Sequence, residues 1–235
     1  MNIILCGYHW TGCKALEILK RQGHCIFVYT HQSPYYVPGL ADYCEKVGVS
    51  YSFENISSSE LPFKPDLICS IYYRYIIKPN VIAACNDKIF NLHPSLLPKY
   101  RGCSSLTWAM IEGEKKAGFT YHYVDEGCDT GKVILQESIA IEEWDTQQTL
   151  YLRVMFESMK SFEKVLSLVE QGYEGEAQEG AESYFNRGCP YDGQILSEWS
   201  HEDKEVFIRA MINPPYPVAK LGDKDIYTMK DLEQA

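Results

Sequence analysis

Residues 2–30, NIILCGYHWTGCKALEILKRQGHCIFVYT, decide the fold class of this chain. The apolar run 2–6 predicts a short buried strand. A helical pattern of apolar residues opens at Thr11 and ends at Gly23, since glycine often closes a helix. Residues 25–30 are again rich in β-branched and aromatic side chains. A strand, a helix and a second strand in this order are typical of an open, doubly wound α/β sheet.

The turn between the first strand and the first helix lacks the spacing of a dinucleotide-binding fingerprint. Such a turn uses closely spaced glycines so that the backbone can approach a pyrophosphate. Here bulky side chains stand between Gly7 and Gly12. We therefore expect no NAD site.

The rest of the chain continues the alternation of strands and helices. Strands are predicted at 49–53, 66–71, 88–92, 119–124 and 133–141, and helices at 41–47, 79–85, 106–111 and 145–172. Asp145 and Gln148 have the spacing of a capping box. The sequence predicts a Rossmann-like, mostly parallel sheet in a main domain at 1–172. Residues 173–235, aromatic and rich in turns, are expected to form a small β-rich C-terminal element with a helical run at 205–211.

Composition and charge argue against several kinds of protein. A chain of 235 residues can bury one full core. No apolar run reaches the roughly 18 residues of a membrane span, and the N-terminus lacks signal-peptide order, so we expect a cytoplasmic protein without a membrane partner. A formal net charge of −10 disfavours a nucleic-acid partner. The nine cysteines lack Cys-x-x-Cys spacing and the six histidines lack metal-ligand spacing, so we expect free thiols and no metal.

The densest chemistry lies in residues 90–102, FNLHPSLLPKYRG. Because side chains alternate along a strand, Asn91 and His93 are predicted to share one face, and Pro94 ends the strand. A carboxamide and an imidazole placed together can polarise a carbonyl oxygen and accept a proton. On its own, such a pair is more often a satisfied loop contact than a catalytic one.

Two other stretches carry candidate functional groups. Arg74 stands among tyrosines at the carboxyl end of a predicted strand, where open α/β sheets place their ligands. It can equally be a surface cation stacked on aromatic rings. The acidic turn 125–131, DEGCDTG, usually indicates a solvated hairpin. These carboxylates become candidates for the active site because a catalytic His93 would need a carboxylate to orient its imidazole.

Taken together, residues 91–102 and 124–131 resemble the 10-formyltetrahydrofolate-dependent formyltransferases, which move a formyl group from a folate to an amine. The first stretch is similar to the family's Asn-x-His-x-Ser-Leu-Leu-Pro segment and the second to its Asp-x-Gly-x-Asp-Thr-Gly loop. Residues 73–77 and 207–210 add to the agreement. The resemblance covers most of residues 1–170.

The resemblance implies an enzyme with 10-formyltetrahydrofolate as donor and no covalent enzyme intermediate. It implies the catalytic trio Asn91, His93 and Asp129, with Asn91 and a protonated His93 holding the developing oxyanion and Asp129 orienting the imidazole. The implied folate contacts are Tyr75, Ile76, Ile77, Asp125, Glu126, Gly127 and Gly131. We expect the acceptor to be bound by Tyr8, His9, Trp10, Arg74, Ser95, Lys99 and Arg101.

Within the family the chain is most similar to the enzymes that formylate amino sugars on nucleoside diphosphates. A tRNA-acting member would carry a basic C-terminal domain, which this acidic chain lacks. The expected acceptor is dTDP-4-amino-4,6-dideoxyglucose, for O-antigen or other surface glycans. UDP-4-amino-4-deoxy-arabinose is an alternative acceptor, and a non-catalytic nucleotide-binding protein is an alternative function. Aromatic side chains beyond Gly175, more than a small element can bury alone, predict a homodimer.

Overall fold

The computed structural model describes residues 1–34, 37–86 and 88–235. The sequence predicts a loop rich in tyrosine at 34–38, PYYVP, and part of that loop lies outside the described residues. The described chain divides into two compact units. Unit 1 comprises Met1–His93, Thr120–Gln136 and Glu157–Gln178, and unit 2 comprises Pro94–Phe119, Glu137–Phe156 and Glu179–Ala235. Segments of the two units alternate along the chain. The domain boundary expected after residue 172 stays a prediction.

The strands are β1 (Asn2–Gly7), β2 (Cys25–Tyr29), β3 (Ser50–Ser52), β4 (Leu67–Ile71), β5 (Ile89–His93), β6 (Arg101–Gly102), β7 (Lys116–Tyr123), β8 (Val133–Ala140), β9 (Tyr184–Phe185), β10 (Ala219–Leu221) and β11 (Lys224–Ile226). The α-helices are α1 (His9–Arg21), α2 (Leu40–Val47), α3 (Pro79–Ala84), α4 (Ser105–Ile111), α5 (Gln147–Glu170), α6 (His201–Ala210) and α7 (Met229–Glu233), and the 3₁₀ helices are η1 (Ile56–Ser58) and η2 (Pro190–Gly193). The predicted elements lie within a few residues of these bounds.

The main sheet has seven strands in the order β3-β2-β1-β4-β5-β7-β8. The pairs from β3 to β5 are all parallel, and β7 joins β5 antiparallel. The predicted open, mostly parallel α/β sheet is therefore confirmed. Parallel strands end at the same edge, so the carboxyl ends of β1, β2, β4 and β5 lie next to one another.

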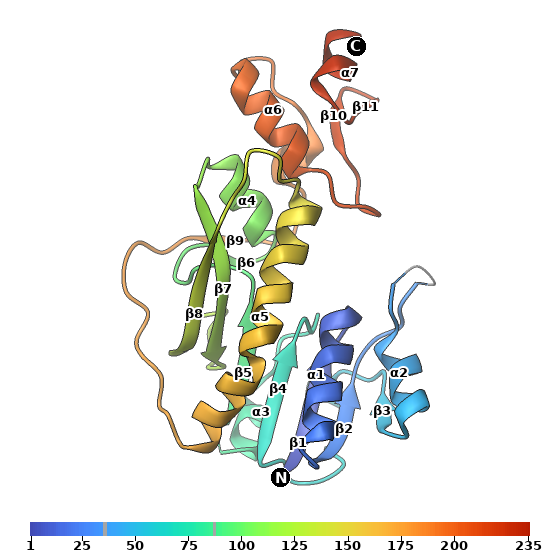
Figure 1. The fold of residues 1–235 in the computed structure, drawn as a ribbon, viewed down its shortest axis with the longest axis vertical. Coiled ribbons are helices and arrows are strands. Elements are labelled where there is room, and N and C mark those ends of the chain that lie inside the picture. Colours follow the sequence, from blue (N-terminus) through green and yellow to red (C-terminus); the bar gives the residue numbers. More distant parts are fainter. Residues whose placement is uncertain (35–36, 87) are drawn as a thin grey trace. The chain divides into compact units, whose positions relative to one another are not determined.

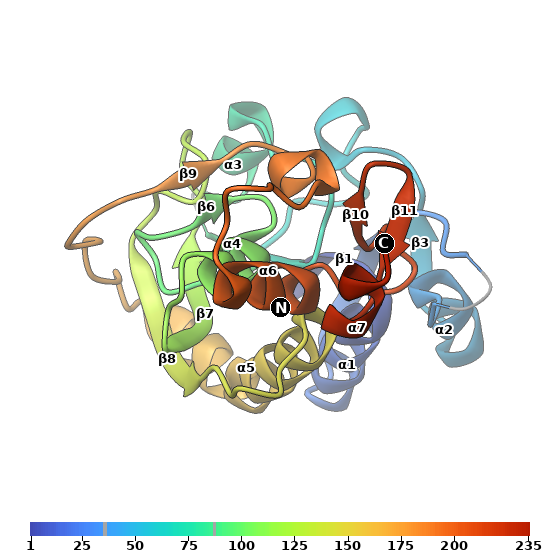
Figure 2. The ribbon, with the colours of Figure 1, turned by 90° about the horizontal axis from the view of Figure 1, so that it is seen from above.

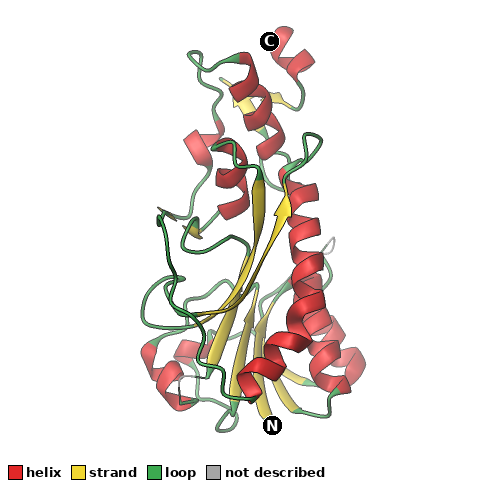
Figure 3. Ribbon diagram, turned by 60° about the vertical axis from the view of Figure 1, so that its left-hand side comes forward, coloured by secondary structure: helices red, strands yellow, loops and turns green. Residues whose placement is uncertain are grey.

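In unit 1, helices cover the sheet on both faces (Figure 1, Figure 3). Ile4 of β1 packs with Val81 and Ile82 of α3 in one core cluster. On the other face, the ring of Phe90 packs against Phe162 of α5, with ring centroids 6.0 Å apart. Since neighbouring side chains of a strand point to opposite faces, Asn91 lies on the face away from Phe162. This alternation positions the site described below.

In unit 2, helices α4 and α6 pack side by side (Figure 2). The core there gathers Phe207 and Ile208 of α6 with Ala219 and Ile226 of the two-stranded β10-β11 sheet. The short strands expected near the C-terminus are present, and helices α6 and α7 occupy more residues than those strands do. No helix in the described part of the chain combines the length and the apolar character needed to cross a membrane.

The start of α5 differs from the sequence prediction. The expected capping box of Asp145 and Gln148 is wrong, because the Gln148 amide donates to the Ile212 carbonyl instead. Thr146 and Thr149 make the reciprocal pair, each amide donating to the other's hydroxyl oxygen. The Asp145 carboxylate is fully buried and pairs with Arg153, a role that its spacing to Gln148 does not reveal.

Unit 2 itself covers much of the aromatic surface that suggested a dimer. The ring of Phe185 stacks on Trp108 with centroids 4.4 Å apart, and Trp199 packs edge-on against Phe207 at 4.9 Å. Tyr184 is 54% exposed. The aromatic side chains thus give less reason for a partner than the sequence suggested, and the homodimer stays a prediction.

Candidate active site

The three predicted catalytic side chains meet within unit 1. Asn91 and His93 lie on one face of β5, and Asp129 comes from the loop between β7 and β8. The Nδ1 atom of His93 lies 3.5 Å from Oδ2 of Asp129, with 6% and 14% of the two side chains exposed. A carboxylate facing Nδ1 orients the imidazole and stabilises its protonated form. With Nδ1 facing the carboxylate, Nε2 is the nitrogen of His93 that could act on a substrate.

A second histidine, His122 of β7, completes this site, and sequence reasoning missed it. The antiparallel register places His122 directly opposite Asn91. Its Nε2 lies 3.2 Å from the Asn91 amide nitrogen and 3.5 Å from Oδ1 of Asp129. Its Nδ1 lies 2.8 Å from the Tyr123 carbonyl oxygen, which only accepts, so Nδ1 carries the proton. In the neutral ring Nε2 is then the acceptor for the Asn91 amide.

The Asn91 carboxamide is held at both ends. Its oxygen accepts a 2.8 Å hydrogen bond from the Ser70 hydroxyl, and its nitrogen donates to His122. An amide nitrogen has two hydrogens, and the second one has no acceptor among the described residues. A donor fixed in place with one free hydrogen can stabilise an oxyanion that develops during a reaction.

The acidic loop has a backbone shape that depends on its glycines. Asp129 itself adopts a left-handed conformation with φ 56°. The Asp125 carboxylate accepts from the Gly127 amide at 3.1 Å and from the Thr130 hydroxyl at 2.6 Å. A β-carbon at Gly131 would lie 1.8 Å from the Tyr123 carbonyl oxygen, which no side chain permits. The predicted residues Asp125, Gly127 and Gly131 therefore shape the loop that carries Asp129.

A distant side chain pins the same loop. The Gln178 amide nitrogen donates to the carbonyl oxygens of Asp129 and Gly131, each at 2.8 Å. Glu176 also pairs through its backbone with Val133 at the start of β8. The segment after α5 thereby fixes the position of the carboxylate that faces His93.

The segment after β4 supplies the other predicted folate contacts. Ile77 is 7% exposed in the core cluster, so only its backbone can meet a ligand, whereas Ile76 is 77% exposed. Val124, which begins the acidic loop, packs against the cluster that contains Ile77. The two segments expected to border a pterin therefore share one core. An exposed apolar side chain and loop backbone groups fit a flat heterocycle with a polar edge.

The predicted acceptor contacts in unit 1 lie at the carboxyl ends of β1 and β4. Tyr8 follows β1, and its ring stacks on His31 with centroids 3.8 Å apart. The guanidinium of Arg74 lies 5.4 Å from the centroid of the Tyr75 ring. Burial, helped by the nearby Arg74 charge, lowers the pKa of His31 to about 4. Burial also lowers the pKa of His9.

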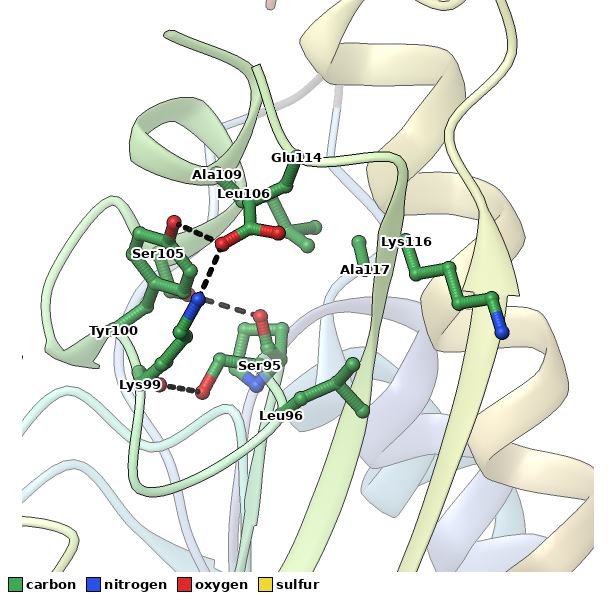
Figure 4. A pocket seen from close by; sticks show the side chains of 11 residues that line it. Ser95, Leu96, Lys99, Tyr100, Ser105, Leu106, Ala109, Glu114, Lys116 and Ala117 are labelled. Carbon is green, nitrogen blue, oxygen red and sulfur yellow. Dashed lines mark hydrogen bonds and ion pairs between the residues drawn. The ribbon is translucent and has the colours of Figure 1, made fainter. Parts of the chain in front are cut away.

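The remaining predicted contacts, Ser95, Lys99 and Arg101, belong to unit 2. Ser95 and Lys99 line a pocket of about 150 Å³ (Figure 4). The Ser95 hydroxyl donates to the Lys99 carbonyl at 2.8 Å, and the Lys99 ammonium pairs with Glu114 at 2.7 Å. Arg101 pairs with Glu182 at 2.6 Å. Both cations therefore already have carboxylate partners within their own unit.

Titratable side chains do not gather into a metal site in the part of the chain that the structure describes. Among those residues, no group of three or more His, Cys, Asp or Glu side chains is arranged to hold a metal ion.

Comparison with known proteins places this geometry in context. Residues 20–166 match the sequence model of a family described as formyl transferase. The GDP-perosamine N-formyltransferase of Brucella melitensis is 42% identical over 172 residues, which are 73% of this chain and 66% of that relative. The match thus spans slightly less than two thirds of the relative's length. The bifunctional polymyxin resistance protein ArnA of Wigglesworthia glossinidia brevipalpis is 34% identical over 248 residues, covering 98% of this chain and 38% of that protein.

A solved structure shows the same fold. The N-formyltransferase of Helicobacter canadensis, solved with folinic acid and dTDP-3-aminofucose, superimposes with a TM-score of 0.83. The alignment covers 96% of this chain and 86% of that one, at 23% identity. At this identity the likeness establishes the fold.

Proposed function

Because the chain belongs to the formyl transferase family, we propose that it moves a formyl group from 10-formyltetrahydrofolate to the amine of a nucleoside diphosphate sugar. The observation that carries the proposal is the placement of Asn91 and His93 on one face of β5, with Asp129 facing His93 from the loop between β7 and β8. The relatives named as sugar N-formyltransferases support the same class of acceptor.

The residues of the site suit each step of such a transfer. As the sugar nitrogen attacks the formyl carbon, negative charge builds on the formyl oxygen, which the free N–H of Asn91 and a protonated His93 can stabilise. A proton leaves the attacking nitrogen as the new C–N bond forms, and a proton reaches the folate nitrogen as the old one breaks. Protonated His93 can donate its Nε2 proton to the folate nitrogen as the old C–N bond breaks, and it can then take up the proton released by the attacking nitrogen, while Asp129 supports the imidazolium. No covalent intermediate with the protein is needed.

We propose that the folate lies against Tyr75, Ile76 and the backbone of the loop 125–131. Exposed Ile76 offers an apolar contact, and the loop offers backbone hydrogen-bonding groups. Glu126 belongs to this loop and stays a predicted contact. Ile77 contributes through its backbone, because its side chain is buried.

The nucleotide of the acceptor is a finer question. The sequence-based expectation of dTDP-4-amino-4,6-dideoxyglucose stays a prediction. The relative with 42% identity is named for GDP-perosamine, which favours a GDP-linked amino sugar as the first acceptor to test. UDP-4-amino-4-deoxy-arabinose stays the alternative acceptor expected from the sequence.

Among the predicted cations, we propose Arg74 as the one that meets the diphosphate. Lys99 and Arg101 each pair with a carboxylate in unit 2, and a phosphate would have to displace that partner. The Arg74 guanidinium lies over a tyrosine ring at the carboxyl end of β4. A guanidinium fork matches two phosphate oxygens at once.

A formyl-transfer assay tests the function directly. The purified protein is mixed with 10-formyltetrahydrofolate and a panel of GDP-, dTDP- and UDP-linked amino sugars, and tetrahydrofolate and formylated sugar are measured. We expect turnover with at least one acceptor and none with the corresponding sugars that lack an amine. Nucleotide binding without any turnover would favour the non-catalytic alternative.

We further propose that the enzyme works in the cytoplasm, as a homodimer, in the supply of formylated sugars for surface glycans such as O-antigen. Exposed tyrosine rings beyond Gly175 support a dimer interface, among them Tyr184, Tyr191, Tyr216 and Tyr227. Light scattering at micromolar concentration checks the oligomeric state, and a monomer there would contradict the dimer.

A further inference from the structure

Three aromatic side chains form a row across the carboxyl edge of the sheet in unit 1. His31 follows β2, Tyr8 follows β1 and Tyr72 follows β4. The rings of His31 and Tyr8 are stacked, with centroids 3.8 Å apart and planes 21° apart. The rings of Tyr8 and Tyr72 are 6.2 Å apart with planes inclined by 14°. Three neighbouring strands thus present nearly parallel rings in one line.

The row lies on the face of the sheet that carries the catalytic side chains. Strand residues that share a core cluster on this face are Cys6, Tyr29 and Ile89. Side chains two residues further along a strand share the same face, so this face carries Tyr8, His31 and Asn91. Ser70, which precedes Tyr72 by two residues, contacts Asn91 directly. The ring row and the catalytic site therefore adjoin on one surface.

Nitrogen atoms around this row lack hydrogen-bond partners. Nδ1 of His31 and Nδ1 of His9, whose ring lies 6.1 Å from that of Tyr8, are buried without a hydrogen-bond partner among the described residues, and so is Nε1 of Trp10, the next residue of α1. Buried polar atoms in folded proteins are nearly always hydrogen-bonded, so several unmet ones in one place indicate a ligand or ordered water.

The chemistry of the row suits a neutral heterocycle or a ribose. With a pKa of about 4, His31 is uncharged at neutral pH, so one ring nitrogen donates and the other accepts. An indole N–H only donates. Mixed donors and acceptors beside flat rings match a nucleoside, whereas a phosphate calls for donors and positive charge.

From these observations we propose that His31, with Tyr8 and Tyr72, binds the nucleoside part of the acceptor. This inference rests on the proposed function and assigns His31 and Tyr72 a role in choosing the acceptor. The strand order gives the distance between His31 after β2 and the catalytic side chains of β5. These two strands are separated by three strand spacings of about 4.8 Å, or about 14 Å. One sugar ring and an extended diphosphate bridge a gap of that order. Arg74 follows β4, a strand that lies between β2 and β5 in the sheet.

Calorimetry on the full chain with GDP, dTDP, UDP and pyrophosphate tests the assignment. The variant His31→Phe keeps a flat ring and removes both nitrogens. We expect it to bind the preferred nucleoside diphosphate at least about tenfold more weakly, as loss of a buried hydrogen bond implies. Pyrophosphate and folinic acid should bind it as they bind the wild type. His201→Phe, an exposed histidine on α6, is the matched control and should change nothing.

The outcomes separate this inference from the proposed function. Unchanged nucleotide affinity in a folded His31→Phe protein overturns the inference, even where formyl transfer is intact. Nucleotide binding that depends on His31 without transfer to any amino sugar supports the nucleoside site and overturns the function. Should His31→Phe fail to fold, Tyr72→Leu takes its place with the same expected loss of affinity. A wild type that binds no nucleoside diphosphate removes the inference outright.

Discussion

Asn91 and His93 lie only a few residues from Lys99 and Arg101, yet the two halves of this stretch are built differently. In the first half, the polar groups orient one another and leave a hydrogen-bond donor of Asn91 unused. In the second half, Lys99 pairs with Glu114 and Arg101 pairs with Glu182. Both halves are polar and both belong to the motif that suggested the family. The difference teaches that unmet bonding capacity, more than polarity, is the reason to propose the first half as the reactive part of the stretch.

The largest effect is expected from substitutions of His93, in the first half of the stretch, and of its partner Asp129. Replacing His93 or Asp129 with asparagine should lower turnover by about two orders of magnitude or more, because it removes the proton relay or its orienting charge. Folate binding should change little. Turnover is measured as tetrahydrofolate release under saturating substrates. Lys99→Met serves as a control, since Lys99 is already paired with Glu114. Near-normal turnover of Asp129→Asn would remove Asp129 from the mechanism.

The next effect contrasts cations from the two regions. Arg74→Ala should raise the KM for the sugar nucleotide about tenfold or more, since a charge-assisted hydrogen bond contributes about 1.5–3 kcal/mol. Arg101→Ala should change it less than about threefold, because Glu182 already holds that guanidinium. Steady-state kinetics with either substrate varied gives both constants. A larger effect at Arg101 than at Arg74 would reverse our assignment of the diphosphate.

A smaller effect is expected at His122, which contacts Asn91 and Asp129. His122→Phe removes one neutral hydrogen bond to the carboxamide, so kcat should fall between about twofold and tenfold. The KM for folate should stay within about twofold. Phe207→Leu, a core change in unit 2, is a control for general destabilisation. If folate binding and kcat fell together, His122 would have a packing role instead of a positioning role.

The smallest effect concerns stability. The pKa of His31 is about 4 in the folded chain and about 6.5 when unfolded, so protonation favours the unfolded state. The stability that the neutral ring contributes is complete above pH 6.5 and is lost as the pH falls from 6.5 towards 4. The Tm of the wild type should therefore drop more between pH 7 and pH 4.5 than that of His31→Phe. Equal drops in calorimetric scans would contradict a buried neutral His31.

Local patterns were enough to predict the part of the site that a single strand determines. The alternation of residues 88–92 correctly predicted that Asn91 and His93 share a face, and residues 2–30 correctly predicted the parallel sheet. His122 escaped because its partnership with Asn91 depends on the register between β5 and β7, which neither strand specifies alone. The signal that the sequence offered was His122 itself, a histidine within the predicted strand 119–124.

Other features depended on contacts far apart in the sequence. The pairing of Arg101 with Glu182 joins residues 81 positions apart, and no local pattern indicates that the cation is already neutralised. The aromatic side chains beyond Gly175 suggested a partner chain because the sequence does not show that Trp108 of α4 would receive Phe185. The sequence shows which charged and aromatic side chains are present, and only the tertiary structure shows which of them already pair with a neighbour.

The contacts of Gln178 have a consequence for the order in which the enzyme matures. Every strand of the main sheet lies before residue 141, so the sheet can assemble while the C-terminal third is still being synthesised. The loop bearing Asp129 gains its two carboxamide bonds only when Gln178 has been made. We therefore expect the main sheet of a nascent chain to form before the loop that carries Asp129 is held in its final position. A chain that ends after α5 but before Gln178 would keep every strand of the main sheet and lack both bonds to the Asp129 loop.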